Sequence, residues 1–217
     1  MAIAEDLVTD VWRLQGSAQL ELDRLVYAIR IFEADCEELE RCLWFFCENP
    51  NSEELYFAGR RRAWARAIAE VIFRLHNCVT SGSDLISDSL CVCDGLYRNS
   101  SPLRACERDE ACRTAKEEVV EFLQEFSDYC VHHQHPVIGT TMTFVDLKRD
   151  KVIRQVTVAR LDLIDFDWSD EAKSFLDQAD ESIDLRKTFE AYRDAVRSCY
   201  NHSNCVSRSR FLLSLVA

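Results

Sequence analysis

Hydrophobic residues near the start of the chain recur every three or four positions, which is the spacing of one face of a long helix. The separations alternate between three and four over residues 22–46, a heptad repeat typical of helices that pack lengthwise. Pro50 ends the pattern, and Ser52 with acidic residues behind it is typical of a new helix start. The positions of the repeat are Leu22, Leu25, Ile29, Phe32, Cys36, Leu39, Leu43 and Phe46.

The same periodicity predicts further helices along the chain. A break is expected at "TSGSD", where Ser81 or Ser83 would cap the following segment. Pro136 and Gly139 end the helix that precedes them. The predicted helical segments are about 58–75, 84–97, 108–132 and 180–200.

Between these helices the period of the pattern changes from helical to alternating. "TTMTFVDL" and "VIRQVTVA" are rich in β-branched and aromatic residues and flank the polar "KRDK", which predicts a hairpin. A short helix capped by Ser169 or Asp170 follows "RLDLIDFDW". The sequence therefore predicts an all-α class, an antiparallel helical bundle with a small β-hairpin insertion near 140–158, in one domain over 1–217.

Charge and composition narrow the class of protein. The net charge of −12 excludes a global attraction to nucleic acid or to anionic membranes, while a local basic patch could still act. The chain begins without the apolar stretch of a secretion signal and has no apolar run of membrane-spanning length. A cytoplasmic protein without a membrane partner is expected. The eleven cysteines are interpreted mainly as small buried hydrophobic residues.

One stretch, "SDYCVHHQHPVIG", places three histidines beside a cysteine. A zinc site built from Cys130, His132, His133 and His135 is one interpretation, but the paired ligand spacing of structural zinc is missing. Adjacent histidines on a helix also point about 100° apart. No metal and no cofactor are therefore predicted, and a zinc-stabilised bundle remains the third alternative. A nucleophilic Cys130 is disfavoured because it lies on the apolar helix face.

Asp128 and His132 are four residues apart and so share one face of the predicted helix. A histidine near a helix end is suited to general acid–base work on a phosphodiester, with the carboxylate orienting it. The alternative is that the histidines of this stretch are solvated residues that cap the helix C-terminus. The sequence leaves both interpretations open.

A dense basic cluster, "GRRRAWAR", stands out in the acidic chain. Its arginines could hold phosphate while the tryptophan stacks a base. Alternatively, the arginines pair with the acidic stretch "EADCEELER" of the first helix. The candidate RNA-binding residues are Arg60, Arg61, Arg62, Trp64 and Arg66.

The order of elements over about residues 110–202 resembles that of HEPN-type helical proteins from bacterial and archaeal defence and toxin–antitoxin loci. The resemblance rests on "FSDYCVH" at the end of a long helix, Pro136, the hairpin, "LDLIDFDW", "AKSFLD" and a last helix with "EAYRDAVRSCY". Active members carry arginine, a polar residue, three variable positions and histidine. They dimerise and cleave RNA without metal.

Carried over by position, His132 matches the histidine of that motif, Asp128 the polar residue and Ser127 the arginine. Serine cannot supply charge to a phosphate. The resemblance thus implies a homodimer that associates with RNA but is catalytically degenerate, in a defence or toxin–antitoxin system. If the protein were active, it would be a metal-independent endoribonuclease. The alternative is a non-catalytic interaction module whose partner is a cognate antitoxin or effector protein.

Overall fold

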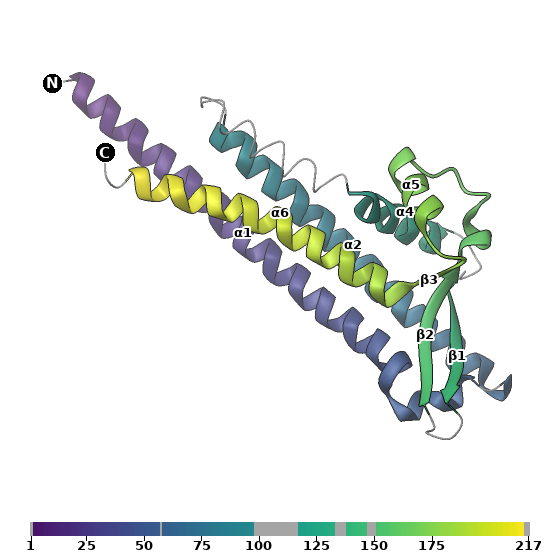
Figure 1. Ribbon diagram of the computed structural model, residues 1–217. Coiled ribbons are helices and arrows are strands. Elements are labelled where there is room, and N and C mark those ends of the chain that lie inside the picture. Colours follow the sequence, from purple (N-terminus) through teal and green to yellow (C-terminus); the bar gives the residue numbers. More distant parts are fainter. Residues whose placement is uncertain (1, 57, 98–116, 133–137, 147–150, 215–217) are drawn as a thin grey trace.

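A computed structural model describes residues 2–56, 58–97, 117–132, 138–146 and 151–214. The chain is mostly helical, with a small three-stranded antiparallel sheet in the order β1-β2-β3 (Figure 1). The elements are α1 (Ala2–Glu48), η1 (Pro50–Tyr56), η2 (Ala58–Arg60), α2 (Arg61–Tyr97), α4 (Glu118–His132), β1 (Ile138–Asp146), β2 (Lys151–Ala159), η3 (Arg160–Leu163), α5 (Asp170–Gln178), β3 (Ser182–Asp184) and α6 (Leu185–Ser214).

The three long helices α1, α2 and α6 lie side by side, and α1 runs antiparallel to the other two (Figure 1). The predicted heptad face of α1 is the one that packs: Phe32 and Leu39 are fully buried, and Leu25 and Phe46 are almost so. Ion pairs between the helices fix their register, with Arg24 of α1 on Asp88 of α2 at 2.7 Å. The start of α1 and the end of α6 lie at the same end of the molecule.

The predicted break in the second helix is wrong, because α2 continues through "TSGSD" without interruption. The hydroxyls of Ser81 and Ser83 donate to the carbonyls of Cys78 and Val79 at 3.2 and 2.9 Å, so they bond back into the helix instead of capping a new one. Gly82 is a packing glycine: a Cβ at this position would collide with the hydroxyl of Tyr192. Close helix packing therefore explains a residue that the sequence pattern suggested was a helix breaker.

The hairpin is confirmed as β1 and β2, with Thr140 opposite Val156. The third strand was not predicted, because its residues were assigned to the last helix. Ile183 is buried and pairs with Val158. The Asp184 carboxylate accepts hydrogen bonds from the backbone amides of Arg186 and Lys187 in the first turn of α6. Asp184, the last residue of β3, therefore caps the N-terminus of α6.

The short helices α4 and α5 pack beside the long ones around a group of aromatic rings. Glu117 is not helical, so α4 begins at Glu118 and not near residue 108; the preceding residues 98–116 lie outside the described part. Ser169 caps α5 as predicted, accepting from the amide of Ala172 at 3.2 Å. The rings of this aromatic cluster are Phe122, Phe126, Tyr129, Phe166, Trp168 and Phe175.

Among the described helices, none combines the length and apolar character needed to cross a bilayer.

Candidate nucleic-acid interface

The residue at the arginine position of the motif, Ser127, points into the protein. Its side chain is 1% exposed, and its hydroxyl shares a hydrogen bond of 3.0 Å with Nδ1 of His76 on α2. The position therefore belongs to the contact between α4 and α2. Even an arginine there would have to leave this contact to reach a phosphate on the outside.

The other two motif residues, Asp128 and His132, are both exposed. They lie one turn apart on the outer side of α4, and His132 is the last residue of the helix. The structure thus brings the predicted acid–base pair together on one surface but separates it from Ser127.

The contacts between α4 and α2 show which part of α2 adjoins the surface that carries Asp128 and His132. Gln124 donates to Ser83 at 2.9 Å, and Ser127 contacts His76, so the two helices run antiparallel at this contact. Residues nearer the C-terminus of α4 therefore lie nearer the N-terminus of α2. By this register Val131, which follows Ser127 by one turn, lies over the part of α2 that contains Phe73.

A row of side chains on α2 continues the surface. Arg62, Arg66, Phe73 and His76 are spaced by four, seven and three residues, which places them on one face of the helix. Both arginines and Phe73 are exposed, and Phe73 retains 54% of its accessible area. We call the surface formed by these four residues with Asp128, Val131 and His132 the α2–α4 face.

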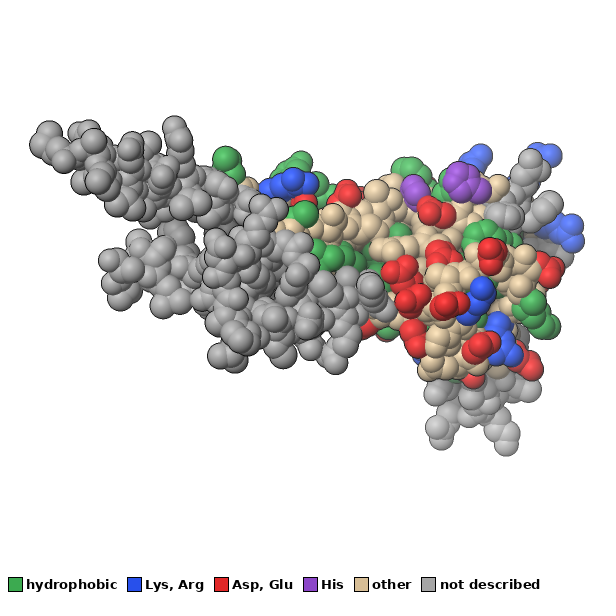
Figure 2. Space-filling model, turned by 90° about the horizontal axis from the view of Figure 1, so that it is seen from above, with side chains coloured by type: hydrophobic (Ala, Val, Ile, Leu, Met, Phe, Trp, Pro, Cys, Tyr) green, Lys and Arg blue, Asp and Glu red, His purple; other side chains and the backbone are tan. Residues whose placement is uncertain are grey.

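Figure 2 shows histidine side chains (purple) on one face of the molecule, with acidic side chains beside them and Lys or Arg side chains further along. The histidines whose side chains the structure describes are His76 and His132. Histidine, acidic and basic side chains therefore occur on the same face of the molecule (Figure 2).

The predicted pairing of the basic cluster with the acidic first helix is wrong for the residues that the structure describes. Arg60 pairs instead with Glu54 at 3.1 Å. Arg61, Arg62 and Arg66 form no ion pair within the described part of the chain. The acids of that α1 stretch pair with other arginines: Glu33 with Arg197, Glu38 with Arg74 and Glu40 with Arg193.

Trp64, the predicted stacking residue, is partly buried. Its indole N–H donates to Oγ1 of Thr140 at 3.0 Å, and its ring packs against the hydrophobic core. It joins the start of α2 to the sheet. Among the α2 side chains that the structure describes, Phe73 is the exposed ring, with the guanidinium of Arg74 at 5.4 Å from the ring centre. Its spacing of seven residues from Arg66 was the sequence signal that could have found it.

The metal and nucleophile interpretations of the histidine stretch gain no support at Cys130. Burial raises the pKa of its thiol to about 12, which keeps the sulfur protonated and a poor ligand or nucleophile. No three His, Cys, Asp or Glu side chains gather closely enough to hold a metal ion within the described residues. His133 and His135 lie outside that part of the chain.

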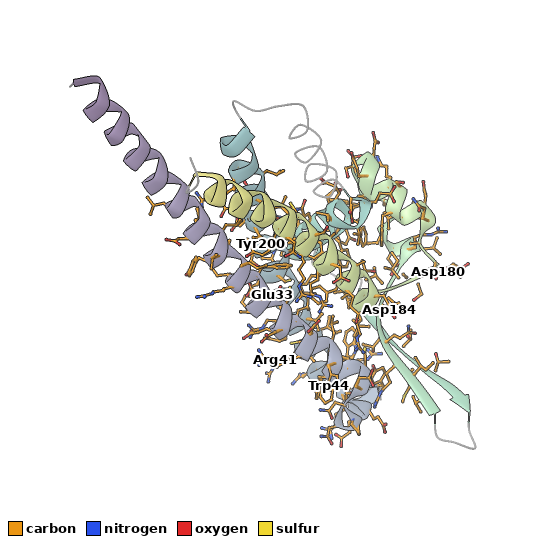
Figure 3. All side chains as sticks on the ribbon, turned by 60° about the vertical axis from the view of Figure 1, so that its left-hand side comes forward. Glu33, Arg41, Trp44, Asp180, Asp184 and Tyr200 are labelled. Carbon is orange, nitrogen blue, oxygen red and sulfur yellow. The ribbon has the colours of Figure 1, made fainter. Side chains whose placement is uncertain are left out.

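A groove of about 470 Å³ lies between α1 and α6, away from the predicted residues. Its apolar floor includes Phe189 and the half-exposed Trp44. Glu190 at its edge is paired with Arg186, so its charges largely compensate. Figure 3 shows Arg41 and Trp44 of this groove on α1, further along the helix than Glu33. The balance of charge gives the groove no preference for an anionic ligand.

Comparisons of the chain with protein-family models, with curated proteins and with solved structures found no match.

Proposed function

We propose that this protein binds single-stranded RNA on the α2–α4 face without cleaving it, as a catalytically degenerate HEPN-like homodimer of a defence or toxin–antitoxin system. The observation that carries the proposal is the row on α2, in which two exposed arginines without described ion-pair partners share a face with an exposed phenylalanine. Such a combination suits a strand whose phosphates and bases are both accessible.

Each group on the α2–α4 face has a distinct role in this proposal. The guanidinium groups of Arg62 and Arg66 hold phosphates, which their planar donors match well. Phe73 stacks one base. His132 and Asp128 lie at the edge of the face, where the imidazole donates to a phosphate or a ribose hydroxyl and the carboxylate orients it.

The absence of cleavage in the proposal follows from Ser127. A serine buried against His76 supplies no positive charge to the phosphate that would react. Asp128 and His132 alone can transfer a proton, but they cannot stabilise the charge that develops on the phosphate in the transition state. Binding without turnover is therefore the function that this arrangement supports best.

RNA binding is tested by fluorescence anisotropy with a labelled single-stranded RNA longer than the roughly 4–16 nucleotides that one such surface covers. The Arg62→Ala/Arg66→Ala variant should bind at least about tenfold more weakly. The slope of log affinity against log salt should fall by about 1.4, because each phosphate contact to a single strand contributes about 0.7. Arg30→Ala/Arg41→Ala, which removes two exposed arginines from α1, is the matched control and should bind as the wild type does.

Phe73→Ala should also weaken RNA binding, but the salt dependence of the affinity should not change, because stacking is not ionic. Incubation of the RNA with the wild type in EDTA should leave it intact. Equal affinity of all variants would refute the proposed site, whereas cleavage that disappears in His132→Ala would refute only its non-catalytic part.

A protein-interaction module is the second candidate function. It is favoured by two large aliphatic side chains on the surface, Leu161 and Ile164, which are 73% and 62% exposed. This candidate is a module that binds an antitoxin or effector protein, and no nucleic acid, through the surface of these two side chains.

A further inference from the structure

The turn after β2 has a periodicity of three that sorts its side chains into separate rows. Side chains three residues apart eclipse one another in a 3₁₀ helix. The 3₁₀ helix η3 spans Arg160–Leu163, Ile164 after it keeps a right-handed helical backbone, and the turn that follows ends at residue 166. Leu163 and Phe166 form the inner row, Leu161 and Ile164 an apolar outer row, and Asp162 and Asp165 an acidic outer row. The two outer rows together are called the η3 patch.

The inner row fixes the turn to the aromatic cluster. Leu163 is fully buried, and its carbonyl accepts a hydrogen bond of 2.7 Å from the indole N–H of Trp168. The ring of Phe166 lies 4.6 Å from that of Trp168 and 5.1 Å from that of Tyr129. The η3 patch is therefore held in place before any partner arrives, which lowers the entropic cost of binding.

The apolar row is exposed despite this firm anchoring. Leu161 and Ile164 retain 73% and 62% of their accessible area, while the neighbouring Leu163 is buried. Isolated exposed aliphatic residues are common on protein surfaces. Here two of them stand three residues apart on one turn of the chain, a spacing that places them on the same side of it.

The acidic row gives this apolar surface a charged border. Asp162 and Asp165 are exposed and form no ion pair within the described residues. Burial raises the pKa of the Tyr129 hydroxyl, and the negative charges of Asp162 and Asp165 raise it further, so both carboxylates act on the edge of the aromatic cluster. Arg160 does not neutralise the border, because its guanidinium donates to the carbonyls of Leu176 and Ala179.

The surrounding segment extends the negative charge. Residues 160–184 contain nine Asp or Glu and two Lys or Arg, a net charge of −7 out of −12 for the whole chain. Lys173 is already paired with Asp167 at 3.7 Å. Such a surface repels phosphate, and its aliphatic side chains offer no ring for base stacking.

We infer that the η3 patch is a docking site for a basic amphipathic segment of a partner protein, whose aliphatic side chains cover Leu161 and Ile164 while its Lys or Arg side chains face Asp162 and Asp165. The inference goes beyond RNA binding and uses a separate surface. Burial of the apolar row would supply most of the affinity, and the carboxylates would mainly speed association and select for positive charge.

The probe for this site is a fluorescent helical peptide of about 18 residues, near the length at which a helix becomes stable alone, with leucines on one face and lysines on the other. One control peptide carries the same residues in scrambled order, and a second replaces lysine by glutamate. The wild type should bind the first peptide at least about tenfold more tightly than either control.

Leu161→Ser/Ile164→Ser should weaken binding of the Leu/Lys peptide at least about tenfold, whereas Asp162→Asn/Asp165→Asn should weaken it several-fold, mainly at low salt. The matched control is Leu20→Ser/Tyr27→Ser, which changes two side chains of α1 that are 72% and 68% exposed. This variant should bind as the wild type does. All changed side chains are exposed, so thermal melting should confirm that the variants fold.

Equal affinity of the wild type and the Leu161→Ser/Ile164→Ser variant, or failure of the Leu/Lys peptide to bind, would overturn the inference. Loss of self-association in that variant, measured by sedimentation, would overturn it by assigning the patch to a second copy of the chain. RNA affinity should be the same for the wild type and this variant. The docking inference and the RNA-binding proposal therefore fail in separate measurements.

Discussion

The long-helix part of the molecule and its α4–α5 part are stabilised in different ways. In the first, α1, α2 and α6 meet along long helical faces, with buried aliphatic and aromatic side chains and cross-helix ion pairs spread over many turns. In the second, a helix of 15 residues and one of nine are too short for such a seam. Large aromatic surfaces concentrated in a few side chains hold them together.

The difference explains where the candidate surfaces lie. Asp128 and His132 are carried by α4, and the η3 patch is attached to the same aromatic cluster. The long helices supply a stable frame, while the short elements set the positions of exposed groups. A few large rings hold those short elements, so single substitutions should affect the two parts differently.

The largest effect is expected for Phe122→Ala in the aromatic cluster. The Phe122 ring is 1% exposed and lies 4.4 Å from the ring of Phe175 and 5.7 Å from that of Trp168. Its loss should cost about 3–5 kcal/mol of unfolding free energy, measured by denaturant unfolding. Hydrogen exchange should show the greatest loss of protection in α4 and α5.

The matched control is Phe32→Ala on α1, where the lost ring is also fully buried. Its cost should be similar in size but spread over α1, α2 and α6. Equal loss of protection in all helices for both variants would show that the two parts unfold as one unit.

An intermediate effect is expected for Gly82→Ala, which tests the close packing of α2 and α6. Alanine favours a helix by about 1 kcal/mol over glycine, yet the new methyl would collide with the Tyr192 hydroxyl. The net result should be destabilisation by about 1–3 kcal/mol, measured by denaturant unfolding. Gly59→Ala, where no atom lies within 4 Å of the added Cβ, should change stability by less than about 0.5 kcal/mol.

Tyr192→Phe removes the colliding hydroxyl together with its hydrogen bond to the Val79 carbonyl. Adding it to Gly82→Ala should therefore cost less than the sum of the two single changes. Strict additivity would mean that the contact with Tyr192 does not limit the approach of the helices.

The smallest effect is expected for Arg197→Gln, which breaks the ion pair with Glu33 between α6 and α1. About a third of each side chain is exposed, so the pair should contribute only about 0.2–1 kcal/mol. That contribution should shrink as salt is added, while the cost of Phe122→Ala should not. A thermal melting series at several salt concentrations measures both, and a salt-independent cost for Arg197→Gln would contradict this assignment.

The sequence predicted which segments form helices and strands better than it predicted which segments pair or pack with one another. The heptad on α1, the hairpin and the Ser169 cap depend on residues close together in the chain, and all three are confirmed. The strand β3 was missed because its pairing with β2 depends on Ile183 meeting Val158. A three-residue strand carries too little alternation to be distinguished from the helix that follows it.

At the candidate site, too, local sequence patterns predicted the helix faces but not the contacts between helices. Helical spacing placed Asp128 and His132 on one face, and both are exposed. That Ser127 would bond to His76, 51 residues earlier in the chain, depends on the register of two helices, which local patterns do not specify. The partial burial of Trp64 and the exposure of Phe73 follow from the same long-range packing.

The arrangement of the chain ends has a practical consequence for work at the bench. The first turns of α1 and the last turns of α6 lie at one end of the molecule, and the sheet lies at the other (Figure 1). With 30 residues, α6 is about 45 Å long. A tag, dye or sensor chip joined through either end would sit roughly that far from the sheet, leaving Arg62, Phe73 and the η3 patch accessible to a ligand in solution.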